Sequence, residues 1–141
     1  MKNLITKQAE FQKTFGRPSK DKPVLISPED AVFRYHLIGE EAQEYLEAAV
    51  LQKDVVEVAD ALGDLLYVVF GTINEHGMQH LITDVFNEIH RSNMSKLFTA
   101  DDGTLYFKNN ENGKTIKPPT YSPPDLTSIL FPEINGEGIQ D

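Results

Sequence analysis

The sequence contains neither cysteine nor tryptophan, and it has no long run of apolar residues. Without cysteine the chain forms no disulfide, carries no thiol nucleophile and offers no thiolate to zinc or to an iron–sulfur cluster. No stretch approaches the ~20 apolar residues of a membrane span, and residues 1–15 lack the uninterrupted apolar core of a signal peptide. These absences predict a cytoplasmic protein with no membrane partner.

Basic residues are scarce as well. The chain has 22 Asp and Glu against 13 Lys and Arg, a formal net charge of −9. Because proteins that bind nucleic acid are basic where they meet the phosphate backbone, this charge argues against a nucleic-acid partner. Ten of the acids but only two bases, Arg34 and Lys53, lie within residues 29–64, so that segment carries 2 − 10 = −8. It forms either a solvated acidic face or a site for cations.

The length and the 40% hydrophobic content predict one globular domain, residues 1–141. Ser27 followed by Pro28 marks a helix start, Asp54 three residues before Glu57 marks a second, and Gly77 marks a stop. The predicted helices cover about residues 3–15, 28–52, 54–76 and 81–94. We therefore expect an all-α fold of the four-helix-bundle type, with its helical core at about residues 1–97.

After residue 97 the sequence predicts less regular structure. Residues 101–103 form a turn signal, residues 105–107 and 115–117 look like the strands of a small hairpin, and five of the eight prolines lie within residues 118–132. Residues 98–141 are therefore predicted as a hairpin and an extended tail with a short helical turn at about residues 125–130.

The spacing of the acids predicts where their carboxylates point. Residues three or four apart share a helix face, so Glu41 neighbours Glu44, and Glu57, Asp60 and Asp64 share one face. The helix that carries the second set is otherwise apolar or small from residue 55 to 73, which predicts that it is buried. Buried carboxylates cost several kcal/mol each unless cations compensate them.

The two nearby bases are too few to neutralise six acids: Glu40, Glu41, Glu44, Glu57, Asp60 and Asp64. A set of hard oxygen ligands without histidine suits Mg²⁺ or Mn²⁺. The bland alternatives are that Glu40 and Glu47 are solvated and that Glu57 only caps its helix. A ferritin-like di-iron site is excluded because no Glu has a His three residues later. The aromatic residues Phe33, Tyr35 and Tyr67 are predicted to pack in the core rather than to stack on a base.

A cationic stretch follows at residues 90–96, His-Arg-Ser-Asn-Met-Ser-Lys. Arg91 and Lys96, with the donors of Ser and Asn, offer what a polyphosphate needs. Alone, they could equally complement the dipole at a helix C-terminus. Beside a carboxylate–metal cluster, phosphate binding is the better interpretation.

These segments resemble the all-α nucleoside triphosphate pyrophosphohydrolase superfamily, whose MazG-like proteins are related to dimeric dUTPases and phosphoribosyl-ATP pyrophosphohydrolase. The resemblance lies in residues 39–48 (GEEAQEYLEA), 57–72 (EVADALGDLLYVVFGT) and 85–96 (VFNEIHRSNMSK). Weaker likeness extends to residues 15–18 and 121–126, so it spans nearly the whole chain. The family's second acidic motif, Glu-x-x-Asp, fits two registers in this chain. Spacing alone places it on Glu57 and Asp60, whereas alignment on the following Leu-Leu-Tyr places its aspartate on Asp64, with Ala61 where many members have glutamate.

The resemblance implies Mg²⁺-dependent hydrolysis of a nucleoside triphosphate to the monophosphate and pyrophosphate, with Mn²⁺ as a substitute metal. It assigns the metal to Glu41, Glu44, Asp60 and Asp64, with Glu57 as an alternative or supporting ligand, and gives Glu40 the role of general base. Arg91, Asn93 and Lys96 would hold phosphate oxygens. It also implies a homodimer or homotetramer. Two alternatives stay open: the same scaffold acting on phosphoribosyl-ATP, and a non-catalytic helical interaction module.

Overall fold

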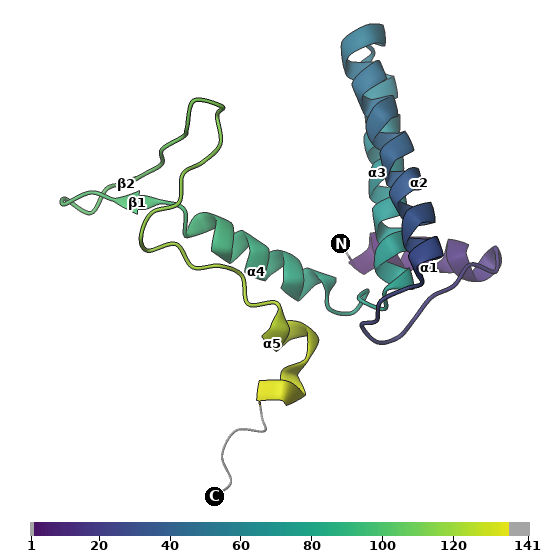
Figure 1. Cartoon of the computed structure of the whole chain (residues 1–141). Helices are drawn as coiled ribbons and strands as arrows, with labels where there is room; N and C mark the ends of the chain where they lie inside the picture. The colour runs from purple at the N-terminus through teal and green to yellow at the C-terminus, as the bar shows by residue number, and fades with distance from the viewer. Residues whose placement is uncertain (1, 136–141) are drawn as a thin grey trace, which may run out of the picture. The chain divides into compact units, whose positions relative to one another are not determined.

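The computed structural model describes residues 2–135, and Met1 and the end of the predicted tail, residues 136–141, lie outside the described residues. The chain divides after His80 into two compact units (Figure 1). The first contains α1 (Lys2–Thr14), α2 (Pro28–Leu46), the π-helix η1 (Glu47–Gln52) and α3 (Val55–Glu75). The second contains α4 (Ile82–Met94), β1 (Phe98–Thr99), β2 (Leu105–Tyr106), α5 (Thr127–Leu130) and the 3₁₀-helix η2 (Pro132–Asn135). The all-α prediction is confirmed, and no helix in the described part of the chain is both long and apolar enough to cross a membrane.

The predicted helix boundaries are confirmed to within one or two residues where a capping signal was present. The Ser27 hydroxyl accepts a hydrogen bond from the backbone N–H of Asp30 at 3.0 Å, with Pro28 in the first turn. The Asp54 carboxylate accepts one from the backbone N–H of Val56 at 2.8 Å. Gly77 ends α3 at φ +70°, a left-handed conformation that glycine adopts without steric cost.

The end of the second predicted helix differs from expectation. The helix does continue to Gln52, but its last six residues form η1, which is a π-helix rather than an α-helix. The turn to α3 then passes through Lys53, whose φ of 55° is left-handed, with its backbone N–H donating to the carbonyl of Ala48. A π-helix has no recognisable residue pattern, and such segments are often found at functional sites.

The prediction that α3 is buried is wrong for most of the helix in the single chain, although Ala61 and residues 70, 71 and 73–75 are buried. The helices α2 and α3 pack together as an antiparallel hairpin (Figure 1), which covers only one side of α3. The apolar side chains of Val55, Leu62 and Leu66 are exposed, and so are the carboxylates of Asp60 and Asp64. The contacts of α2 and α1 are not enough to cover a helix that is apolar nearly all round.

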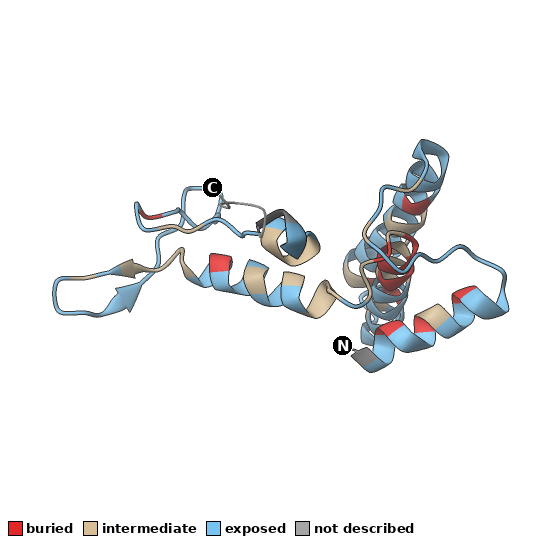
Figure 2. Cartoon of the chain, turned by 90° about the horizontal axis from the view of Figure 1, so that it is seen from below, coloured by how far each residue is buried: buried red, intermediate tan, exposed pale blue. Residues whose placement is uncertain are grey.

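The best-buried part of the first unit is polar and lies where α1 meets α3 (Figure 2). The side-chain amide of Gln12 donates to the carbonyl of Gly71 at 3.2 Å, and that of Asn74 donates to Gln8 at 2.7 Å. Gly71 leaves room for this arrangement, since a Cβ there would lie 2.7 Å from Nε2 of Gln8. The helices of the first unit are therefore joined by amide hydrogen bonds as well as by apolar contacts.

One of the two bases within the acidic segment forms an ion pair with a carboxylate outside that segment. Arg34, on α2, forms a buried ion pair and hydrogen bond with Glu75 at the end of α3. Arg34 therefore does not neutralise the carboxylates of the acidic segment, because its carboxylate partner is Glu75.

In the second unit the strand pairing differs from the predicted hairpin. Phe98 pairs with Tyr106 and Thr99 with Leu105, antiparallel, around the turn at residues 101–103. The predicted partners of residues 105–107 make only an isolated bridge further on, between Asn109 and Thr115. The helical turn predicted in the tail is confirmed by α5.

Candidate functional site

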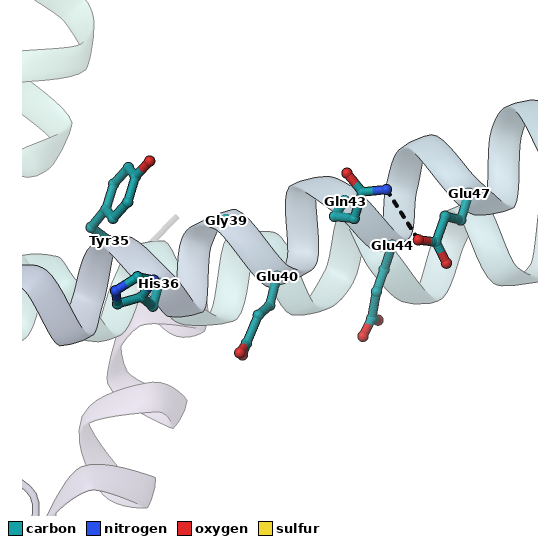
Figure 3. A pocket seen from close by; sticks show the side chains of 7 residues that line it. All are labelled: Tyr35, His36, Gly39, Glu40, Gln43, Glu44 and Glu47. Atoms are coloured by element: carbon teal, nitrogen blue, oxygen red, sulfur yellow. Dashed lines mark hydrogen bonds between the residues drawn. The ribbon is translucent and has the colours of Figure 1, made fainter.

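The first group of predicted ligands lies along one arm of the hairpin. Figure 3 shows the side chains of Glu40 and Glu44 extending to the same side of α2. They line a groove of about 540 Å³, and Glu47 at its end accepts a hydrogen bond from Gln43 at 3.0 Å. The complete lining of this groove is Tyr35, His36, Gly39, Glu40, Gln43, Glu44 and Glu47.

A second cavity, of about 260 Å³, is lined by residues from both arms of the hairpin. Glu44 and Glu47 line it from α2 and η1, and Glu57 and Asp60 line it from α3. Its remaining lining residues are Ala48, Gln52 and Ala61. The two cavities share Glu44 and Glu47, so the acidic surface continues from the groove on α2 across to α3.

Two of these acids, Glu47 and Glu57, are not among the four metal ligands that the sequence predicts. Glu47 is given no site role by the sequence, with solvation as the alternative, although it lies three residues after Glu44 and this spacing could have identified it. Glu57 is predicted as a capping residue, a supporting ligand or an alternative ligand. The cap is Asp54, as its spacing predicts, and Glu57 lines the cavity with Asp60. Both belong to the acidic cluster, which we define as Glu40, Glu41, Glu44, Glu47, Glu57, Asp60 and Asp64.

The electrostatics of Glu41 link the remaining members of the cluster. Partial burial raises the pKa of the Glu41 carboxyl, and repulsion from Glu44, Asp64, Glu40 and Asp60, in decreasing order, raises it further. Within residues 2–135 the side-chain ion pairs are Arg34 with Glu75 and Arg91 with Glu88, so no base neutralises the cluster. The folded chain therefore concentrates negative charge that a cation would relieve.

The arrangement of the cluster fits a hard divalent cation by its chemistry. All its donors are carboxylate oxygens, the ligands that Mg²⁺ and Mn²⁺ prefer. No three Asp, Glu or His side chains in the described part of the chain converge closely enough to complete a metal site. The structure thus gathers the predicted ligands on one surface of the hairpin without bringing them into coordination distance of one point.

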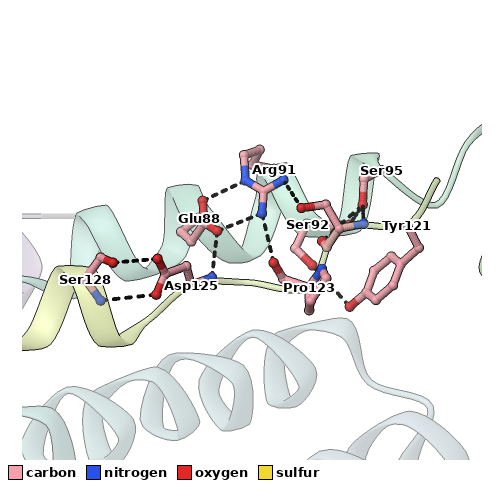
Figure 4. Close-up of polar contacts among 9 residues, drawn as sticks. Glu88, Arg91, Ser92, Ser95, Tyr121, Pro123, Asp125 and Ser128 are labelled. Carbon is pink, nitrogen blue, oxygen red and sulfur yellow. Dashed lines mark hydrogen bonds and ion pairs between the residues drawn. The ribbon is translucent and has the colours of Figure 1, made fainter. Parts of the chain in front are cut away.

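The predicted phosphate ligands lie on α4, in the second unit. The guanidinium of Arg91 donates two hydrogen bonds to Glu88, at 2.8 Å and 2.7 Å, and others to Ser122 and to the carbonyl of Pro123 (Figure 4). Lys96 donates to the side chain of Asn93 at 2.5 Å. Arg91 is therefore used to hold the tail of the chain, whereas the ammonium of Lys96 keeps further donors.

The aromatic residues that were predicted to pack in the core are partly exposed instead. Tyr35 is 71% exposed, and Phe33 and Tyr67 are each more than a third exposed. Phe33 and Tyr67 line a separate cavity of about 230 Å³ with Phe11, and the guanidinium of Arg17 lies 5.6 Å from the centre of the Phe33 ring. Core packing was therefore the wrong expectation for these three side chains.

Comparison with known proteins gives two findings. A family model described as phosphoribosyl-ATP pyrophosphohydrolase matches residues 8–93, more than half of the chain. The matched region includes all of α2, η1 and α3, which carry the acidic cluster, and most of α4. The chain is also similar to "Uncharacterized protein L479" of Acanthamoeba polyphaga mimivirus, with 39% identity over 66 residues. That alignment covers 44% of this chain and 26% of the relative, so the match spans about a quarter of that protein's length.

Proposed function

The chain belongs to the phosphoribosyl-ATP pyrophosphohydrolase family, and from this premise we propose that it is a Mg²⁺-dependent hydrolase that splits nucleoside triphosphates into the monophosphate and pyrophosphate. The observation that carries the proposal is the acidic cluster inside the matched region. Of its seven carboxylates, five line the two adjoining cavities, Glu41 and Asp64 repel each other nearby, and none forms an ion pair with a base within residues 2–135. Uncompensated carboxylates of this kind are suited to holding the divalent cation that accompanies a nucleotide.

We assign the metal to Glu41, Glu44, Asp60 and Asp64, and the structure supports adding Glu57 as a neighbour of Asp60. Bound there, Mg²⁺ would neutralise charge on the phosphate oxygens and make a bound water more acidic. The raised pKa of Glu41 supports its assignment, because partial burial and the repulsion from neighbouring carboxylates, which raise it, are both offset by a bound cation.

The chain's own residues then have distinct tasks. Glu40, exposed in the groove beside Glu44, is placed to accept a proton from the attacking water as general base. Lys96 and Asn93 offer donors to phosphate oxygens, and Arg91 does so only if its bonds to Glu88 and the tail are exchanged.

We further propose that the working form in the cytoplasm is a homodimer or homotetramer. Val55, Ala59, Leu62 and Leu66 follow one another at spacings of four, three and four residues, so they form one exposed apolar stripe on α3. The face with Asp60 and Asp64 lies roughly half a turn away from it. A second copy packed on the stripe would bury α3, as its composition requires, and leave the acids accessible.

The direct test is hydrolysis by the purified chain with Mg²⁺. We would offer canonical and modified ribo- and deoxyribonucleoside triphosphates together with phosphoribosyl-ATP, and measure pyrophosphate and monophosphate. We expect release of pyrophosphate, none in EDTA, and partial recovery with Mn²⁺. No turnover on any member of the panel would overturn the proposal.

Phosphoribosyl-ATP is the second candidate substrate, because the family model carries that name. The relative values of kcat/KM on the same panel decide between it and the triphosphates. A non-catalytic helical module is distinguished by calorimetry with Mn²⁺: the enzyme should bind the metal, and binding should weaken at least tenfold in Glu44→Gln and Asp64→Asn. Absence of binding, or equal binding by both variants, would favour the module.

A further inference from the structure

The second unit holds two lysine side chains beside one phenol. The ammonium of Lys117 lies 4.2 Å from the centre of the Tyr121 ring. Lys96, at the end of α4, also acts on this phenol: the pKa of Tyr121 is lowered, first by a hydrogen bond from Ser92 and then by the charges of Lys117 and Lys96. Both charges therefore act on the same phenol, and Lys117 does so from over the face of its ring.

The position of Tyr121 is fixed by its own loop and by α4. Its backbone N–H donates to the carbonyl of Pro118 at 3.0 Å, which closes a turn between Lys117 and Tyr121. The hydroxyl of Ser92, a buried residue of α4, donates to the Tyr121 oxygen at 3.2 Å. The next residue, Ser122, donates its N–H to the side chain of Ser95 at 2.9 Å (Figure 4). The phenol is therefore a fixed element and not a freely rotating surface side chain.

Neither lysine is neutralised by a carboxylate. Among residues 2–135, no Asp or Glu oxygen lies within 4.0 Å of Lys96 or Lys117, although the chain as a whole is strongly acidic. The ammonium of Lys96 is also not needed to cap the C-terminus of α4. The carbonyls of Arg91, Asn93 and Met94 already accept hydrogen bonds from the backbone N–H groups of Ser95, Lys96 and Leu97. Lys96 gives one of its three donors to Asn93, and the Tyr121 proton has no acceptor within the described residues.

We propose that Lys117 and Tyr121 complete, with Lys96, a phosphate-binding site on the second unit. Two ammonium groups without a carboxylate partner in the described residues, together with a phenol hydroxyl held against α4, supply donors and positive charge, which suit a group with several anionic oxygens. The occupant rests on the proposed function: it is the phosphate chain of the nucleotide or the pyrophosphate released from it. The site itself requires no metal and no hydrolysis.

The experiment measures binding of inorganic pyrophosphate to the full chain in EDTA by calorimetry. Lys117→Gln should weaken binding about tenfold or more, since a charge-assisted hydrogen bond contributes about 1.5–3 kcal/mol. Lys117→Arg should retain most of the binding, and Tyr121→Phe, which keeps the ring, should weaken it severalfold. Lys114→Gln is the matched control, an exposed lysine of the same region without a side-chain contact in the described structure.

The outcomes distinguish the phosphate chain of the nucleotide from free pyrophosphate as the occupant. They also test the phosphate-binding site separately from the proposed hydrolase activity. If Lys117→Gln also raises KM for the triphosphate with little change in kcat, the site holds the substrate, whereas loss of pyrophosphate binding alone assigns it to the free anion. Pyrophosphate binding that depends on Lys117 in a chain that hydrolyses nothing would support this site and remove the proposed activity. Equal binding by the native chain, Lys117→Gln and Tyr121→Phe would overturn the site. Circular dichroism verifies that each variant is folded.

Discussion

Arg34 and Glu75, 41 residues apart in the sequence, form a buried ion pair between α2 and the end of α3. Their side chains are 8% and 4% exposed. The pair lies next to Gly71 and the buried amides of α1, so it joins the three helices of the first unit. It also removes from the acidic cluster one of the two bases that the acidic segment contains.

Breaking this pair should destabilise the chain strongly. In Glu75→Ala the buried guanidinium loses its partner, so the free energy of unfolding should fall by about 3–5 kcal/mol. The double variant Arg34→Met/Glu75→Leu should recover most of the loss, because it leaves no buried charge. Urea unfolding at fixed protein concentration measures both, with the exposed Glu10→Ala on α1 as control. A Glu75→Ala variant as stable as the control would contradict the burial of the pair.

Two glycines of α3 should respond oppositely to alanine. In Gly71→Ala the new Cβ would meet Gln8 at 2.7 Å and Arg34 at 3.0 Å, so we expect a loss of about 1–3 kcal/mol. A Cβ added at Gly63 would meet no atom of another segment of the described chain within 4 Å. Gly63→Ala should therefore raise the free energy of unfolding by up to about 1 kcal/mol through helix propensity. Thermal unfolding of the two variants side by side gives the comparison. Equal effects would mean that the buried amide contacts are not as described.

The carboxyl of Glu88 should titrate far below the usual range. Its hydrogen bonds from Arg91, then from the backbone N–H of Asp125, and the charge of Arg91 lower its pKa from 4.5 to about 2. A depressed folded pKa stabilises the fold above the unfolded value and loses that contribution as the pH falls from about 4.5 to about 2. Carboxyl NMR titration should place the midpoint of Glu88 near 2, and Arg91→Gln should move it back toward 4.5. A midpoint near 4.5 in the native chain would rule out this contact in solution.

Magnesium should stabilise the chain more as the pH rises through the pKa of Glu41. Because its pKa is raised, Glu41 ionises less readily in the folded chain than in the unfolded chain. Without a cation, the free energy of unfolding therefore falls as the pH rises through the folded pKa of Glu41. A bound cation reverses this cost, because it favours the ionised carboxylate. The increase in Tm with Mg²⁺ over EDTA should therefore grow between pH 4.5 and pH 8, and the growth should be reduced in Glu41→Gln. An increase that is independent of pH in both proteins would speak against Glu41 as a ligand.

The two registers of the second acidic motif predict different ranks of inactivation. With Asp60 and Asp64 as the working pair, Asp64→Asn should lower kcat at least 100-fold, and Glu57→Gln should keep most of the activity. The repulsion between Asp64 and Glu41 favours this ranking, and the cavity shared by Glu57 and Asp60 favours the other. Steady-state hydrolysis of the best triphosphate, with folding verified by circular dichroism, decides it. The reverse ranking would assign the metal to Glu57 and Asp60.

The sequence by itself determined most of the helix boundaries and six of the seven members of the acidic cluster. Ser27, Pro28, Asp54 and Gly77 set helix ends through local hydrogen bonds and backbone geometry, which need no distant partner. The i,i+3 and i,i+4 spacing likewise placed Asp60 and Asp64 on one face, because a helix face depends only on the period of the helix.

Tertiary structure alone decided which distant groups meet. The pairing of Arg34 with Glu75, the amide contacts of Gln8 and Gln12, and the hydrogen bond between Ser92 and Tyr121 join segments with no shared local pattern. The exposure of α3 was mispredicted for a related reason: composition shows that a helix needs covering, but only the arrangement of the chain shows whether the cover comes from the chain itself.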